Sequence, residues 1–107
     1  MNETEKMIMG IISSSGESKS KAFEALKAVR NSDYDLARQL LKESQEADVE
    51  AHNIQTLLIQ KELSDSEEER TPMSLLMVHA QDQYMSSALA RDLIEELVKI
   101  FEEKNMM

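Results

Sequence analysis

The sequence has no cysteine or tryptophan, one proline and only two glycines among its 107 residues. Without cysteine, disulfide bonds and thiolate metal sites are excluded. Proline and glycine interrupt helices, so their scarcity permits long uninterrupted helices. Aromatic residues, which favour strands, make up 4% of the chain, whereas good helix formers such as alanine, leucine, glutamate and methionine are abundant. These features predict an all-α protein.

Two further absences bear on partners and location. Acidic residues number 21 against 12 basic ones, a net charge of −9, so we expect no nucleic-acid partner because phosphates would be repelled. No apolar run approaches the roughly 20 residues that span a bilayer, and the segment Met1–Lys6 is not a basic leader. We expect a single cytoplasmic domain over residues 1–107, whose acidic surface suits a partner with a basic face.

Apolar and small residues recur at helical spacing in three segments, at about residues 3–29, 34–63 and 72–104. This spacing predicts three long helices. Asp33 or Ser32 can cap the second helix, and Thr71 followed by Pro72 is a typical start for the third. Because the connections are short, the helices should pack up-down-up as an antiparallel three-helix bundle.

The third segment carries two apolar stripes, whereas a surface helix of a lone small bundle needs one. The first stripe consists of Met73, Met77, Ala80, Tyr84, Ala88, Ile94, Val98 and Phe101. The second stripe consists of Leu75, Val78, Asp82, Met85, Leu89, Leu93 and Ile100. Two stripes predict burial against two sets of partners. A carboxylate in the second stripe is costly unless it is paired, protonated or bound to a cation.

His79 carries the strongest functional hypothesis. It lies three residues before Asp82, one helical turn away, on the flank of the second stripe. Imidazole can attack phosphorus and carry a phosphoryl group, and the amides of Gln81 and Gln83 could donate to the phosphoryl oxygens. The sequence has no nucleophile elbow, no glycine-rich phosphate loop and only two histidines. A triad hydrolase and a mononuclear zinc enzyme are therefore not expected.

Other segments carry weaker signals. In the second helix, His52 and Gln55 share one face and are candidate binding residues, although a histidine such as His52 is by itself more often a surface or hydrogen-bonded histidine than a reacting one. The small residues Ser13–Gly16 predict either a kink or fray in the first helix, or room for another helix or a docking partner. The charged run 64–71 predicts a solvated linker.

Four segments of the sequence resemble the lactose/cellobiose-type enzyme IIA of the bacterial sugar phosphotransferase system. They are Ala22–Ala28, Asn31–Tyr34, Ala51–Thr56 and Leu76–Met85. The run His-Ala-Gln-Asp at 79–82, followed by an apolar methionine segment, is the most specific of these features. Val78 directly before this run favours the cellobiose/chitobiose branch over the lactose branch.

The resemblance implies a homotrimer whose nine helices form one bundle. It implies that His79 accepts a phosphoryl group from the phosphocarrier HPr and donates it to a cognate enzyme IIB, with membrane contact only indirectly through enzyme IIC. Asp82 matches the family's acidic residue at the three-fold axis, where three copies bind a divalent metal. We expect Mg²⁺ there, because carboxylate oxygens are suited to this ion.

The residues alone leave two other functions open. The chain could be a helical interaction module without chemistry, in which His79 is incidental. It could also be a two-component histidine phosphotransfer domain, which is helical and acidic as well. That domain needs a four-helix bundle and usually has a lysine shortly after its histidine, whereas Ala80, Gln81 and Gln83 follow here.

Overall fold

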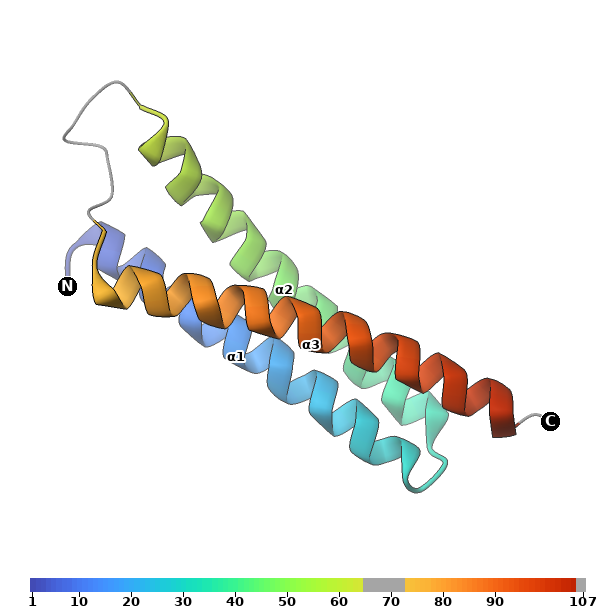
Figure 1. Ribbon diagram of the computed structural model, residues 1–107. Helices are drawn as coiled ribbons and strands as arrows, with labels where there is room; N and C mark the ends of the chain where they lie inside the picture. The colour runs from blue at the N-terminus through green and yellow to red at the C-terminus, as the bar shows by residue number, and fades with distance from the viewer. Residues whose placement is uncertain (65–72, 106–107) are drawn as a thin grey trace.

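The computed structural model of the protein describes residues 1–64 and 73–105. It contains three helices, α1 (Glu3–Val29), α2 (Tyr34–Glu62) and α3 (Leu75–Asn105). They run up-down-up, so α1 and α3 are parallel and α2 is antiparallel to both (Figure 1). Within the described ranges every regular element is helical. The predicted all-α, antiparallel three-helix bundle is confirmed.

The helix boundaries follow from capping side chains. Asn2 accepts the backbone N–H of Glu5 at 2.8 Å and caps α1. Asp33, one of the two predicted caps, accepts the N–H of Leu36 at 3.1 Å and caps α2. The alternative cap, Ser32, instead adopts a positive φ of 55° in the turn between α1 and α2.

The predicted start of the third helix at residue 72 was wrong. Met73 and Ser74 precede α3, which begins at Leu75. The Ser74 hydroxyl accepts the backbone N–H of Met77 at 3.1 Å, so this serine caps the helix closer to its first buried residue. Thr71 and Pro72, the predicted cap and first residue, lie outside the described residues, as does most of the predicted linker 64–71.

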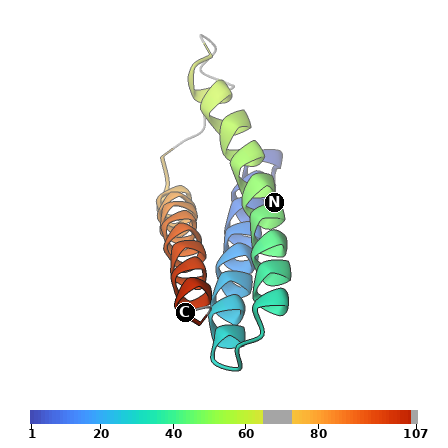
Figure 2. The same ribbon diagram turned by 90° about the vertical axis from the view of Figure 1, so that its right-hand side faces the viewer.

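Helix α1 lies between the other two helices (Figure 2). It packs along both, whereas α2 and α3 contact each other far less. At one end of the bundle α2 and α3 are joined by an Arg38–Glu102 ion pair and by Asn105, whose Nδ2 donates to the Tyr34 hydroxyl at 2.7 Å. Toward the other end α2 diverges from α3 (Figure 1).

Two apolar clusters form the core, separated by a layer of small side chains. The clusters centre on Ala22, Ala25, Ala28, Ala37, Ile94 and Val98, and on Ile8, Ile11, Leu58, Met77 and Ala80. In the intervening layer, Ser44 Oγ donates to the Ser18 carbonyl at 2.7 Å, and the two hydroxyl oxygens are 3.1 Å apart. Small side chains there allow the helices to approach closely.

The predicted kink or fray at Ser13–Gly16 is absent from α1, which continues through these residues. Ser14 and Ser15 are buried against the other helices, so the patch leaves room for helices of the same chain. Ser13 is exposed and Gly16 half-buried. The patch therefore has an inner and an outer side.

The two glycines of α1 predict different responses to alanine. Alanine favours a helix over glycine by about 1 kcal/mol. A Cβ at Gly16 would lie 3.5 Å from Gln83 Nε2, an ordinary contact, whereas one at Gly10 would lie 2.9 Å from Ile54 Cδ1. Gly16→Ala should raise the free energy of unfolding by about 0.5–1 kcal/mol in urea denaturation. Gly10→Ala should raise the free energy of unfolding by less, because Ile54 must shift to make room. Equal increases for the two variants would contradict this packing.

The second stripe of α3 is exposed along its whole length. The helix buries Met77, Ala80, Ile94 and Val98 of the first stripe. Leu75, Met85 and Leu89 of the second stripe are 86, 68 and 62% exposed. None of the helices in residues 1–64 and 73–105 covers this surface. Phe101 and Met73, both assigned to the first stripe, are also exposed, because one lies near the end of α3 and the other precedes it.

No helix among the described residues is long and apolar enough to cross a membrane.

Candidate functional site

His79 lies in the second turn of α3 with its side chain exposed. At about 100° per residue, it is about 60° around the helix from Asp82 and about 160° from Gln81. The ring therefore occupies one flank of the second stripe, next to Asp82, while Gln81 lies on the opposite flank. Its exposure makes the ring accessible to a large partner.

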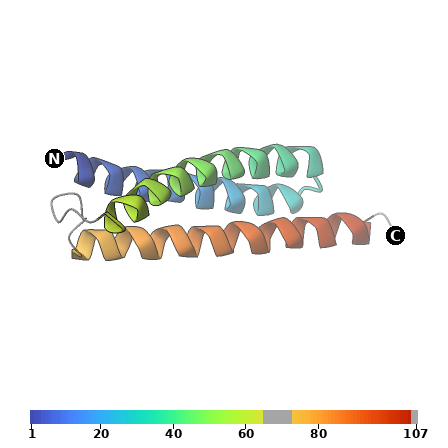
Figure 3. The same ribbon diagram turned by 90° about the horizontal axis from the view of Figure 1, so that it is seen from above.

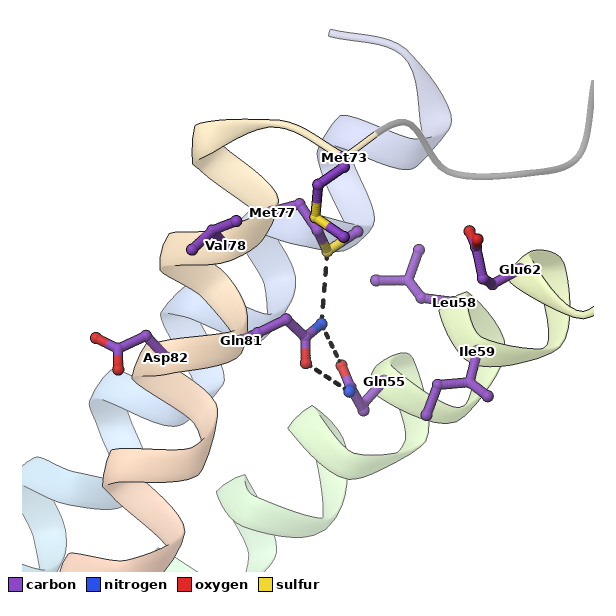
Figure 4. Close-up of a pocket in the computed structure, with 9 residues that line it drawn as sticks. All are labelled: Gln55, Leu58, Ile59, Glu62, Met73, Met77, Val78, Gln81 and Asp82. Atoms are coloured by element: carbon purple, nitrogen blue, oxygen red, sulfur yellow. Dashed lines mark hydrogen bonds between the residues drawn. The ribbon is translucent and has the colours of Figure 1, made fainter.

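The amides of Gln81 and Gln55 pair with each other. Gln55 Nε2 donates to Gln81 Oε1 at 2.6 Å, and Gln81 Nε2 donates to Gln55 Oε1 at 2.7 Å. Gln81 Nε2 also lies 3.5 Å from the sulfur of Met77. These bonds tie α3 to α2 (Figure 4). The structure brings together two predicted binding residues, but it does not bring them to His79.

His52 also contributes to the contact between α2 and α3. Its Nδ1 lies 3.1 Å from the hydroxyl of Tyr84, one turn from the paired amides. Burial raises the pKa of the Tyr84 phenol, and the negative charge of Asp48 raises it further, so the phenol stays neutral. The sequence interpretation placed Tyr84 in the apolar stripe and missed this bond. A tyrosine in such a stripe usually needs a partner for its hydroxyl, and that signal could have revealed it.

Gln83 is the predicted donor on the same side of α3 as His79. The two are four residues apart, one turn along the helix. Gln83 Nε2 is 3.5 Å from the position that a Cβ at Gly16 would occupy, so this side of α3 faces α1. Of the four candidate binding residues, Gln83 alone lies where its amide could reach a group carried by His79.

A groove of about 510 Å³ opens where α2 and α3 diverge. Its lining is mostly apolar, with the paired glutamines bridging α2 and α3 and Asp82 on the outer side of α3 (Figure 4). The lining residues are Gln55, Leu58, Ile59, Glu62, Met73, Met77, Val78, Gln81 and Asp82. Val78 and Asp82 also belong to the second stripe, so the groove and the exposed stripe form one continuous surface.

Within residues 1–64 and 73–105, Asp82 has no neighbouring side chains that would complete a metal site. No group of three histidine, cysteine, aspartate or glutamate side chains that could hold a metal occurs among residues 1–64 and 73–105. Asp82 is exposed in the middle of the apolar stripe.

The sequence matches the family described as PTS system, Lactose/Cellobiose specific IIA subunit, over residues 6–102. The chain belongs to this family. A relative from Escherichia coli strain K12, the N,N'-diacetylchitobiose-specific EIIA component of a PTS system, is 42% identical over 101 residues, covering 94% of this chain and 84% of the relative. The family assignment confirms the resemblance found in the sequence.

Solved structures of IIA proteins share the fold. The cellobiose-specific enzyme IIA from Bacillus anthracis has a TM-score of 0.90 and 31% identity, with 99% of this chain and 94% of that chain covered. The chitobiose IIA of Escherichia coli, solved in complex with HPr, has a TM-score of 0.81 and 39% identity, with 98 and 99% covered. Among the three functions considered from sequence, this family supports the phosphoryl carrier.

In this IIA chain the candidate residues therefore divide into two groups on opposite flanks of the second stripe. Gln83 lies against α1, and His79 precedes it by one turn, whereas Gln81 lies on the α2 side with Gln55 and His52. Asp82 lies on the exposed stripe, on the outer side of α3 and pointing away from the paired glutamines (Figure 4). The first group pairs an exposed imidazole with a nearby amide donor. The second group fixes α3 against α2.

Proposed function

We propose that this IIA chain accepts a phosphoryl group from HPr on His79 and passes it to a cognate enzyme IIB. The observation that carries the proposal is an exposed histidine, with an amide donor one turn away, in a chain of the lactose/cellobiose IIA family. HPr is the partner of the chitobiose IIA in a solved complex. Enzyme IIB, and through it the membrane component IIC, follow from the role of a IIA subunit.

The transfer requires little from the chain itself. A ring nitrogen of neutral His79 offers its lone pair to phosphorus. The bond from phosphorus to the donor atom breaks, with the electron pair staying on the donor, while a bond to His79 forms. Transfer to enzyme IIB reverses these roles. Gln83 can donate its amide N–H to a phosphoryl oxygen, whereas the amide of Gln81 is already engaged by Gln55.

Incubation with phosphoenolpyruvate and the general phosphocarrier proteins tests this function. The chain should acquire one phosphoryl group, labile in acid and stable in alkali as expected of phosphohistidine. This group should then pass to a cognate enzyme IIB. A folded chain that acquires no label would contradict the proposal and would favour a helical interaction module.

The exposed second stripe supports assembly of three copies into the nine-helix bundle implied by the resemblance. Its apolar members are Leu75, Val78, Met85, Leu89, Leu93 and Ile100. Burying each contributes roughly 1.5–3 kcal/mol per subunit before entropy costs. An apolar surface of this length on a highly charged chain is otherwise unfavourable in water.

A homotrimer around the second stripe would bring three Asp82 carboxylates to one axis. Their mutual repulsion opposes assembly at neutral pH, and a divalent cation such as Mg²⁺ would relieve it. The exposed position of Asp82 between apolar neighbours fits this role. The metal would then stabilise the assembly.

Asp82→Leu should make the thermal stability of the protein independent of divalent metal. Chelator should lower the melting temperature of the wild type, because three charges are then left unbalanced. The variant should keep the trimer without responding to chelator, since leucine suits the apolar stripe and introduces no charge. Differential scanning calorimetry with and without chelator measures both responses. A variant as sensitive to chelator as the wild type would show that Asp82 does not anchor the metal.

We infer a cytoplasmic location, because the proposed phosphoryl transfer draws on phosphoenolpyruvate and the general phosphocarriers. Contact with the membrane is then indirect, through enzyme IIB bound to enzyme IIC.

A further inference from the structure

The paired amides of Gln55 and Gln81 lie in mostly apolar surroundings. Each glutamine donates to the other, at 2.6 and 2.7 Å, so the two planar groups meet through two hydrogen bonds. Leu58 and Met77 line the same groove. Replacing both partners of such a pair by apolar groups of similar shape is often neutral or stabilising. The stability of the chain therefore gives no reason for two amides at this place, and another role is left.

Orientation is the property that apolar packing leaves open in this part of the bundle. The first turns of α3 pack through Met77 and Ala80 against the apolar cluster that includes Ile11 and Leu58. Apolar contacts have no preferred direction, and a methionine side chain adapts to its neighbours. Helix α3 runs parallel to α1 (Figure 3), whereas α2 diverges from it. Packing alone therefore resists a small rotation of α3 about its own axis only weakly.

The amide pair supplies the direction that packing lacks. A hydrogen bond weakens as its donor and acceptor move out of line, so two bonds between planar amides oppose rotation of either partner. Gln55 extends from α2, which packs along α1 and serves as the fixed side of the pair. Gln81 is the point at which α3 is held. The pair thus sets the rotation of the first turns of α3.

His79 follows any rotation of Gln81, because the two residues are two positions apart in one continuous helix. A helix with its side chains has a radius of about 5–6 Å, so a rotation of about 10° moves the imidazole by roughly 1 Å. A misplacement of about 1 Å can slow a reaction by a factor on the order of 100. The alignment of His79 is therefore sensitive to a residue on another helix, Gln55.

We propose that Gln55 is a positioning residue for phosphoryl transfer and that it acts on His79 through its pair with Gln81. The pair holds the ring in line with a donor whose approach is fixed by a protein interface. This inference rests on the proposed function and adds a residue of α2 to it.

Gln55→Leu tests the inference when phosphorylation is measured with two donors. One is phospho-HPr, and the other is phosphoramidate, a small molecule that transfers its phosphoryl group to imidazole with release of ammonia. With phospho-HPr, kcat should fall about tenfold while KM changes less than about twofold. With phosphoramidate the rate should stay unchanged, because a small donor can adjust its approach to the exposed ring of His79.

The double variant Gln55→Leu, Gln81→Leu separates positioning from stability. Two leucines should keep or raise the melting temperature, because no amide is then left unpaired. With phospho-HPr, kcat should fall by the same factor as in the single variant, since the two glutamines act as one unit. Tyr34→Phe is the matched control. It removes the hydroxyl that accepts from Asn105, another bond between α2 and α3 at the far end of the bundle, and should leave both rates unchanged.

Three outcomes would decide against these expectations. An unchanged kcat with phospho-HPr in both leucine variants would overturn the positioning role. So would equal slowing with both donors, because the substitution would then act on the chemistry of the ring and not on its alignment. A wild-type chain that neither donor phosphorylates would instead refute the proposed function.

Discussion

His79→Ala should abolish phosphorylation of the chain by phosphoenolpyruvate and the general phosphocarriers. The substitution removes the exposed imidazole that the proposed transfer phosphorylates. His79 is exposed and makes little packing contribution, so the variant should retain the helical content and melting temperature of the wild type. Autoradiography and circular dichroism measure the two properties.

His52→Ala is the matched control, since His52 is the other histidine of the chain and is also exposed. His52 lies on α2 and is hydrogen-bonded to Tyr84. It is therefore not on the side of α3 that carries His79. The control should keep one phosphoryl group per chain, with a modest loss of stability from the broken bond. Label retained by His79→Ala, or lost in His52→Ala, would move the phosphorylation site away from His79.

Leu89→Glu should convert the trimer into monomers or unfolded chains. Leu89 is 62% exposed in the single chain, near the middle of the second stripe. In the proposed trimer three glutamates would meet in an apolar environment, where an unpaired charge is strongly unfavourable. The molar mass measured by light scattering at micromolar concentration should therefore fall from that of a trimer to that of a monomer, or the protein should aggregate.

Val49→Glu is the control for this assembly. Val49 is exposed on α2, away from the second stripe, so the same change in charge should leave the trimer intact. A wild-type chain that scatters as a monomer would refute the trimer. A Leu89→Glu variant that remains a trimer would show that the copies meet through another surface.

Much of the fold could be predicted because it depends on local patterns. Composition and helical spacing predicted three helices, and Asp33 was one of two predicted caps. The start of the third helix was predicted too early, because Thr71 and Pro72 are residue types that favour the cap and the first position of a helix. Ser74, three residues after Thr71, is the cap in the structure. Sequence gives the candidates for a cap, but the packing of the following turn selects among them.

The site was predicted less completely, because pairing across helices depends on register. Gln55 and Gln81 are 26 residues apart, and no local pattern shows that their amides meet. Helical geometry alone could have separated Gln81 from Gln83, since residues two positions apart in a helix point in directions about 200° apart around its axis. The position of Gly16 against Gln83 depends on the parallel packing of α1 and α3, which the pattern of apolar residues leaves free.

The central position of α1 has a consequence for how the chain folds. The turn between Val29 and Tyr34 is short, so closing the α1–α2 hairpin costs little loop entropy and gives a local nucleus. Helix α3 has few contacts with α2 and needs α1 as its template. We therefore expect it to associate after the α1–α2 hairpin has formed. The helix that carries His79 and the second stripe should thus be fixed last within the chain, so that the surface proposed to bind other copies is completed only when the monomer has folded.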